Sequence, residues 1–320
     1  MNRLEKIEDR LFFIVGCGRS GTTLLKTMLN SHKNISIPHE TFFFNSITNS
    51  LQEPEISTES KLQVLKSKWW IQEMNPDFAE IQGLLPEKYA SWSRVFLALM
   101  SEITNKDAQI VGEKTPSHIL KSSEILEEFK DAKIIQIVRD PRAVFRSFKK
   151  TTVGTNQIAT CLLEWEESIL VGLKLRKHPR YICVKFEELL LNPKNTLSTL
   201  CTFLDIEYDT RMLEFYKRSV DGFSVEQSHH RNTALPIFTS NLNAWKVDIT
   251  KNQIAIIEHK LSSHMQKFDY ELKGCKTFFP RVQLFISEYI DRAHKAFIRK
   301  PKQHLKKRRA QKRMRLVKKN

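Results

Sequence analysis

The stretch FFIVGCGRSGTTLLKTMLNSHKNISIPHE, residues 12–40, decides the fold of this chain. Residues 12–15 form a short apolar run of aromatic and β-branched side chains, which is typical of a buried strand. Glycines at positions 16, 18 and 21 end that run, and from Thr22 onward apolar residues recur at helical spacing. The stretch therefore predicts a strand, a glycine loop and a helix. This geometry directs backbone N–H groups and the positive end of the helix at an anion.

The loop differs from the phosphate loop of nucleotide hydrolases. Gly16 and Gly21 have the spacing of the G-x-x-x-x-G-K-[ST] pattern, but Thr22 stands where that pattern has lysine. The lysine normally reaches the β- and γ-phosphates of ATP, whereas here the cation is Arg19, inside the loop. The sequence favours a single phosphate or phosphosulfate group over a magnesium triphosphate. A glycine turn that binds no ligand is the alternative, because the two-glycine pattern alone is loose.

Strand-like and helix-like segments alternate through the rest of the chain. Residues 41–106 look helical and are long enough to form the wall of a substrate cleft. The pattern predicts the α/β class, with a parallel β-sheet flanked by helices, a P-loop-like strand–loop–helix and a largely helical insert. We expect further strands at 109–111, 133–138 and 181–185, and helices at 117–129, from Pro141, at 156–176, at 189–204 and at 254–265.

Three charged motifs lie where predicted strands end. Arg19 follows the first strand, Lys114 follows the strand at 109–111, and Arg139 follows the strand at 133–138. Ligands of open parallel sheets bind at this edge, so these cations are candidates for a ligand site. An ion pair of Arg139 with Asp140 or Glu113 is the structural alternative.

Several of these motifs, in this order, resemble the sulfotransferases that use 3′-phosphoadenosine 5′-phosphosulfate (PAPS). The likeness runs from about residue 11 to residue 249. Residues 112–116 (GEKTP) are similar to a segment of the carbohydrate branch of that family. The resemblance implies transfer of the sulfonate of PAPS to an acceptor hydroxyl of a carbohydrate or glycolipid, leaving 3′-phosphoadenosine 5′-phosphate (PAP). It implies cofactor contacts from the 5′-phosphosulfate loop, the 3′-phosphate site and the end of a cofactor lid: Arg19, Ser20, Gly21, Thr22, Thr23, Leu24, Arg139, Ser147, Trp245 and Lys246.

Sulfonate transfer needs a base for the proton of the acceptor. The resemblance implies Glu40 as this base, because the heparan-type and tyrosylprotein branches place a glutamate shortly after the first helix. His39 is the second candidate, since cytosolic sulfotransferases use a histidine. Arg19 and Lys114 complete the expected catalytic set, with Lys114 neutralising the sulfonate or binding an acidic acceptor. A glutamate at a helix start and a surface lysine are the structural alternatives.

The chain departs from the family at four places. The loop carries Arg19 where the cytosolic and heparan branches have a lysine. Compared with the tyrosylprotein branch, Phe186 replaces a tyrosine and Thr151 replaces a basic residue, and Lys246 follows Trp245 where that branch has the lysine first. These departures leave the cofactor expectation intact and put the acceptor in question.

Composition bounds the remaining classes. Five scattered cysteines without a C-x-x-C pair fit a reduced compartment and argue against zinc, and we expect no metal. The charged N-terminus lacks the apolar core of a signal peptide and no apolar run approaches 18 residues, so a cytoplasmic protein is expected. Alternatives from other classes are a regulatory module that binds nucleotide without turnover and a P-loop kinase.

The basic charge is concentrated at one end. The formal net charge is +16, but residues 292–320 carry fourteen lysines and arginines and no acid, which leaves only +2 on residues 1–291. We expect 1–291 to form the sulfotransferase domain and 292–320 a basic tail. Apolar residues recur at helical spacing over 282–298, so we expect a peripheral contact with an anionic membrane, with a solvated tail as the alternative. We expect no nucleic-acid partner, because only the tail favours one.

Overall fold

The structure is a computed structural model that describes residues 3–48, 56–151, 158–217, 235, 237–239 and 242–294, with the side chains of residue 151 and of 291–294 excepted. The chain divides into two compact units, residues 1–139 with 167–240 and residues 140–166 with 241–320. Each unit is described by itself. The expected cofactor lid, residues 221–245, and the basic tail fall mainly outside the described residues.

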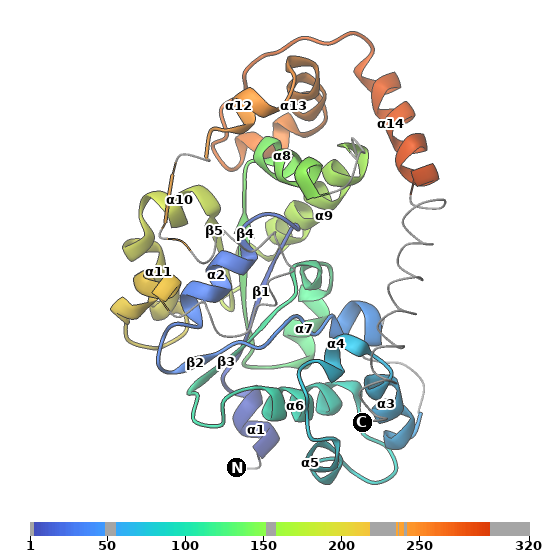
Figure 1. Ribbon diagram of the computed structural model, residues 1–320, viewed down its shortest axis with the longest axis vertical. Coiled ribbons are helices and arrows are strands. Elements are labelled where there is room, and N and C mark those ends of the chain that lie inside the picture. Colours follow the sequence, from blue (N-terminus) through green and yellow to red (C-terminus); the bar gives the residue numbers. More distant parts are fainter. Residues whose placement is uncertain are drawn as a thin grey trace, which may run out of the picture. The chain divides into compact units, whose positions relative to one another are not determined.

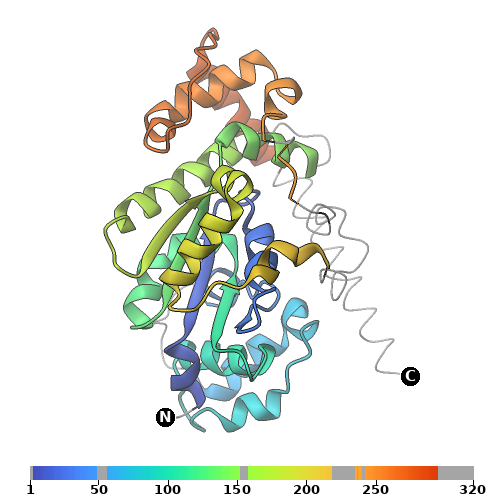
Figure 2. The ribbon, with the colours of Figure 1, turned by 90° about the vertical axis from the view of Figure 1, so that its left-hand side faces the viewer.

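A five-stranded parallel sheet forms the centre of the first unit, with the order β2-β3-β1-β4-β5 (Figures 1 and 2). All the apolar positions of the central strand are buried, as expected for a sheet covered on both faces. The predicted parallel sheet flanked by helices is therefore confirmed. The strands are β1 (Leu11–Gly16), β2 (Ile35–Ser36), β3 (Ile110–Lys114), β4 (Lys133–Val138) and β5 (Tyr181–Lys185).

Two of the predicted strands, 133–138 and 181–185, have the predicted bounds. The strand predicted at 109–111 is longer and includes Lys114, which pairs in register with Ile14 of β1. The short strand β2 was not predicted, because two residues are too few for an alternating pattern. Parallel pairing brings the carboxyl ends of β1, β3 and β4 to one edge of the sheet.

Residues of β1 alternate between two packed faces. Phe13 belongs to an aromatic cluster in which its ring centroid lies 5.8 Å from Phe96, 6.0 Å from Phe44 and 6.3 Å from Phe129. Phe96 lies on α6 and Phe129 directly follows α7, so this face is covered by the helical insert and α7. The other face packs on α2, which contacts β1 and β3.

The insert at 41–106 is helical as predicted, except that it begins with a π-helical turn, 43–47. The predicted helix at 117–129 consists of a 3-10 turn followed by an α-helix. Helices of this unit are α1 (Arg3–Glu8), α2 (Thr22–Leu29), η1 (Phe43–Ile47), α3 (Thr58–Lys66), α4 (Trp69–Gln72), α5 (Phe78–Gly83), α6 (Trp92–Ile103), η2 (Pro116–Lys121), α7 (Ser122–Glu128), α10 (Phe186–Leu191), α11 (Pro193–Phe203) and η3 (Thr210–Lys217), and α9 (Ile158–Leu175) crosses into the second unit.

The second unit is helical and is organised around one buried arginine. The guanidinium of Arg142 pairs with Asp140 and with Glu258 at 2.7 Å each, and it lies 4.0 Å from the ring centroid of Trp245. These contacts join three helices through a fully paired charge. The helices of this unit are α8 (Pro141–Thr151), α12 (Trp245–Asp248), α13 (Lys251–Gln266) and α14 (Pro280–His294). Across the described residues, no helix is both long and apolar enough to cross a membrane.

Candidate functional site

The glycine loop joins β1 to α2 in the predicted place. Two glycines are required there for different reasons. At Gly16 (φ 149°) a Cβ atom would collide with the carbonyl oxygen of Ile137 on β4, and at Gly21 (φ 99°) it would collide with the ring of Phe186. Positive φ values favour glycine at both positions. The loop backbone therefore lies tightly against the sheet and against Phe186.

The start of α2 and the hydroxyl of Ser20 are available to an anion. Arg19 lies in the left-handed region at φ 68°, and Gly21 caps α2 without any side-chain hydrogen bond to the first helical amides. The hydroxyl of Ser20 is completely buried and has no hydrogen-bond partner among the described residues. Uncapped amides at a helix start together with a buried unbonded hydroxyl fit a bound oxyanion.

Arg139 lies beside this loop. Its Nη1 donates to the carbonyl oxygen of Arg19 at 3.2 Å, and its guanidinium carbon lies 4.3 Å from the ring centroid of Phe186. Phe186 therefore contacts both Gly21 and Arg139. The structure brings together two arginines that are 120 residues apart in sequence.

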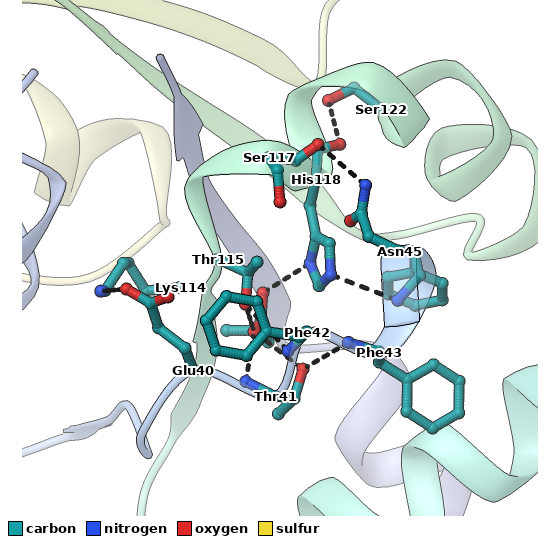
Figure 3. Close-up of polar contacts among 12 residues, drawn as sticks. Glu40, Thr41, Phe42, Phe43, Asn45, Lys114, Thr115, Ser117, His118 and Ser122 are labelled. Carbon is teal, nitrogen blue, oxygen red and sulfur yellow. Dashed lines mark hydrogen bonds and ion pairs between the residues drawn. The ribbon is translucent and has the colours of Figure 1, made fainter. Parts of the chain in front are cut away.

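Glu40 and Lys114 form an ion pair, shown at the left of Figure 3. Lys114 ends β3 and its side chain is only 4% exposed, whereas the side chain of Glu40 is 28% exposed. The carboxylate of Glu40 is therefore accessible to a ligand, and Lys114 contacts this carboxylate from the buried side. Two members of the expected catalytic set are in direct contact.

A buried network fixes the backbone on either side of this pair. The carboxylate of Glu113 accepts hydrogen bonds from the hydroxyl of Thr115 at 2.6 Å, from the hydroxyl and N–H of Thr41 at 2.9 and 3.2 Å, and from Nδ1 of His118 at 2.9 Å. Burial alone would raise the pKa of Glu113, but the electrostatic interaction with His118 and the hydrogen bonds from His118, Thr115 and Thr41 outweigh burial and lower the pKa. Glu113 therefore remains an anion inside the protein.

The hydrogen bonds also determine the form of His118. The N–H of Phe44 donates to Nε2 of His118 at 3.2 Å, so Nε2 carries no proton and Nδ1 donates to Glu113 (Figure 3). Thr41 adjoins Glu40, and Glu113 adjoins Lys114. The network thus ties the loop that carries Glu40 to the strand that carries Lys114. The sequence did not predict these positioning residues, because their role depends on contacts between distant segments.

A second lysine, Lys26 of α2, belongs to the same cluster and was also missed. It is 8% exposed, and its pKa is lowered to about 7, first by burial and then by the charge of Lys114, against the opposing charges of Glu40 and Glu113. His39 is exposed, yet its pKa is lowered by desolvation and then by Lys26 and Lys114. Five titratable side chains therefore interact electrostatically here. The available signal in the sequence was a lysine inside the apolar face of a predicted helix.

The remaining expected cofactor residues belong to the second unit. Ser147 is half-buried on α8, and Lys246 is exposed on α12. Trp245 is 3% exposed and packs on Arg142, so its indole ring supports the helical core of that unit. Their contact with a cofactor stays a prediction, as does the joint action of Arg139 and Ser147. Among the described residues, no group of three or more histidine, cysteine or acidic side chains is arranged to hold a metal ion.

Comparisons with known proteins give a consistent picture. A family model described as "Sulfotransferase family" matches residues 12–210. Protein-tyrosine sulfotransferase 1 of Danio rerio is 26% identical over 210 residues, which are 63% of this chain and 55% of that protein. Protein-tyrosine sulfotransferase A of Caenorhabditis elegans is 22% identical over 294 residues, 88% of this chain and 73% of that protein. The chain thus spans only about half the length of the zebrafish relative.

Solved structures agree on the fold. The sulfotransferase domain of the olefin synthase from Synechococcus PCC 7002 superposes with a TM-score of 0.59 at 24% identity, over 82% of this chain and 95% of that domain. This likeness extends past the end of the family match at residue 210.

Proposed function

Because the chain belongs to the sulfotransferase family, we propose that it transfers the sulfonate group of PAPS to a hydroxyl of an acceptor. The proposal is supported by the charged groups that the structure brings together at the edge of the sheet where β1, β3 and β4 end. Arg19 and Arg139 lie together beside the uncapped start of α2, and the Glu40–Lys114 pair ends the neighbouring strand. Anion-binding groups and a base are thus available at one sheet edge, as the reaction requires.

The described residues fit PAPS. The uncapped amides of α2, the buried hydroxyl of Ser20 and Arg19 would hold its 5′-phosphosulfate. Arg139 would contact the 3′-phosphate, with Ser147 as the further donor that the family resemblance implies. Trp245 and Lys246 remain proposed contacts on the same ground.

PAPS supplies the group that moves: the bond from sulfur to the 5′-phosphate oxygen breaks with its electron pair on that oxygen, while the acceptor oxygen bonds to sulfur and loses its proton. Glu40 is the proposed acceptor of that proton, because its carboxylate is partly exposed and lies against a buried cation. Lys114 orients Glu40, and the Glu113–His118 network holds both segments in place. His39 remains the alternative base.

For the acceptor, we propose a carbohydrate or glycolipid hydroxyl. Residues 112–116 resemble the carbohydrate branch, and the rings of Phe42 and Trp70 meet edge to face at 5.9 Å directly after Glu40. Trp70 is anchored by a 2.8 Å hydrogen bond to the carbonyl of Thr41, so an aromatic surface adjoins the proposed base. Peptide tyrosine is the second candidate, favoured by the names of the relatives.

A transfer assay tests the proposal. The full chain is incubated with PAPS labelled at sulfur and with a heparan-type oligosaccharide, a galactosylceramide, a tyrosine peptide and 4-nitrophenol. We expect label on the glycan or glycolipid, and label on the peptide alone would correct the acceptor class. In parallel, PAP should raise the melting temperature far more than ATP, since a ligand of the native state stabilises it. Equal stabilisation by ATP would favour the kinase alternative, and PAP binding without any transfer would favour the regulatory module.

We further propose that α14 and the basic segment after it contact an anionic membrane surface. Five large apolar side chains of α14 are 51–72% exposed: Val282, Phe285, Ile286, Tyr289 and Ile290. They recur every three or four residues, and fourteen cations follow in residues 292–320. This combination supports a peripheral membrane contact from the cytoplasmic side, which stays a prediction.

A further inference from the structure

Lys26 occupies an unusual place for a lysine. It lies on α2 among Leu25, Met28 and Leu29, each 0% exposed, and is itself 8% exposed. A charged ammonium in such surroundings is unfavourable unless a counter-charge accompanies it.

Within the part of the chain that the structure describes, no side chain supplies that counter-charge by direct contact. Across residues 3–48, 56–151, 158–217 and 242–294, the ammonium of Lys26 has no hydrogen-bond acceptor and no carboxylate within ion-pair distance. The acidic groups whose charges act on it are engaged elsewhere: Glu40 with Lys114, and Glu113 with His118 and two threonine hydroxyls. The neighbouring cation Lys114 makes the position still less favourable for a positive charge.

The position of Lys26 on the helix indicates which groups its side chain can reach. Helical side chains lean toward the N-terminus, so Lys26 extends back toward Thr22 and Thr23, one turn earlier, where α2 presents its uncapped amides. Charges of Lys114 and Glu40 at the end of β3 also act on it. Lys26 is therefore placed one turn after the anion-binding helix start, and its ammonium is close enough to the proposed base for their charges to interact.

From this arrangement we infer that Lys26 is a sulfonate-binding residue, whose ammonium donates to the sulfonate oxygens of PAPS. The inference rests on the proposed function and deepens it. The 5′-phosphate already has the loop amides and Arg19, whereas the sulfonate must lie between that phosphate and the acceptor whose proton Glu40 takes. A buried ammonium near Glu40 matches the sulfonate, and a bound oxyanion supplies the counter-charge that the protein leaves out.

PAP and PAPS differ only by the sulfonate group, so a comparison of their affinities isolates the contribution of the sulfonate. Titration calorimetry on the full chain measures both ligands for the wild type, Lys26→Met, Lys26→Arg and the control Lys33→Met, which removes a charge from an exposed position nearby. We expect Lys26→Met to weaken PAPS about tenfold or more, PAP less than twofold, and the control neither. Lys26→Arg should recover part of the loss. An equal loss for PAP and PAPS, or no loss for either, would overturn the inference.

Proton uptake gives a second readout. At pH 8 the amine of free Lys26 is mostly neutral, since burial and Lys114 lower its pKa to about 7, and a bound sulfonate should restore its proton. Titrations in two buffers of different ionisation enthalpy should show uptake of up to one proton with PAPS in the wild type and none in Lys26→Met. Uptake that persists in Lys26→Met would assign the proton to another group and contradict the inference.

The outcomes also separate this inference from the proposed function. If the wild type binds neither PAP nor PAPS, the proposed function itself is wrong. Normal binding of both with no selective effect of Lys26→Met would remove only the role of Lys26. If Lys26→Met instead raises the KM of an acidic acceptor with PAPS affinity unchanged, then Lys26 recognises the acceptor and the inference is wrong. The melting temperature of Lys26→Met without ligand should equal or exceed that of the wild type, which excludes loss of folding as the cause.

Discussion

At the scale of single residues, the Glu40–Lys114 pair combines an accessible carboxylate with a cation that solvent barely reaches. Glu40→Gln keeps the shape of the side chain and removes the proposed base. We expect turnover to fall about 10²–10⁴-fold while the affinity for PAP changes little, because general base catalysis contributes that much. Initial rates with saturating PAPS, together with PAP calorimetry, measure both quantities.

His39→Ala is the matched comparison, since His39 precedes Glu40 and is the other candidate base. We expect its turnover to remain within a few fold of the wild type. The opposite pattern, with His39→Ala inactive and Glu40→Gln active, would reassign the base to the imidazole.

Arg139 donates a hydrogen bond to the carbonyl oxygen of Arg19 in the glycine loop and packs against the ring of Phe186 on α10. Arg139→Ala should weaken PAP binding about tenfold or more, because a hydrogen bond to a charged group contributes about 1.5–3 kcal/mol. The exposed Arg94→Ala serves as the control for loss of one positive charge. Titration calorimetry decides, and an unchanged dissociation constant for Arg139→Ala would contradict its phosphate role.

The low pKa of Lys26 has a consequence for stability. The amine is protonated in the unfolded chain up to its ordinary pKa near 10.5, but in the folded protein only up to about pH 7. Between these values the unfolded state binds more protons, so this lysine makes stability rise with pH, and its destabilising effect is complete below pH 7. The free energy of unfolding of ligand-free Lys26→Met should exceed that of the wild type most at pH 7 and least at pH 10. Urea titrations across this range test the expectation, and a pH-independent difference would refute it.

At the scale of elements, β3 and the loop after β2 are joined by Glu113 and His118. In Glu113→Gln the side-chain NH2 group is a donor that would face another buried donor of the network. This unsatisfied pair should cost about 1–3 kcal/mol of stability. It should also reduce kcat, because the segments that carry Glu40 and Lys114 lose their common anchor, while PAP affinity is retained. Urea unfolding and steady-state kinetics measure the two effects.

The control for this change is the exposed Glu127→Gln on α7, which should alter neither quantity. Should Glu113→Gln lose stability but keep full turnover per folded molecule, the network would be structural only. Rescue by Glu113→Asp is not expected, since the shorter side chain cannot reach the same four donors.

At the scale of the whole molecule, charge is distributed very unevenly. Residues 1–291 are close to neutral, and residues 292–320 carry fourteen cations directly after the exposed apolar face of α14. We expect the full chain to sediment with phosphatidylserine-rich vesicles at low salt and to detach at high salt, since each cation near the surface contributes about 1 kcal/mol. Deleting residues 299–320 should abolish binding and leave transfer to a small soluble acceptor unchanged.

Phe285→Ser with Tyr289→Ser separates the two parts of this surface, because it removes apolar area without changing charge. The double variant should bind the same vesicles more weakly. Vesicle binding that survives the deletion would contradict a membrane role. Equally strong binding to DNA, together with unchanged vesicle binding by the double variant, would also contradict it.

Much of this protein follows from local sequence. The run at 12–15, the glycines after it and the apolar spacing from Thr22 determine a strand, a loop and a helix, because the backbone preferences of these residues and the period of their apolar side chains are local properties. The strands at 133–138 and 181–185 and the helix from Pro141 are equally local, and the structure has them with the predicted bounds or start. The parallel sheet then follows from the alternation of strands and helices.

The composition of the site depends on tertiary structure. Glu40 and Lys114 are 74 residues apart, and Glu113 meets Thr41 across 72 residues, so no local pattern could pair them. Whether Lys26 is an ordinary surface lysine or a buried cation depends on what packs over α2, and this is decided only when the strands align. Local spacing determines which elements form, whereas burial and partners, which set charge and reactivity, arise from contacts between segments that the chain brings together only on folding.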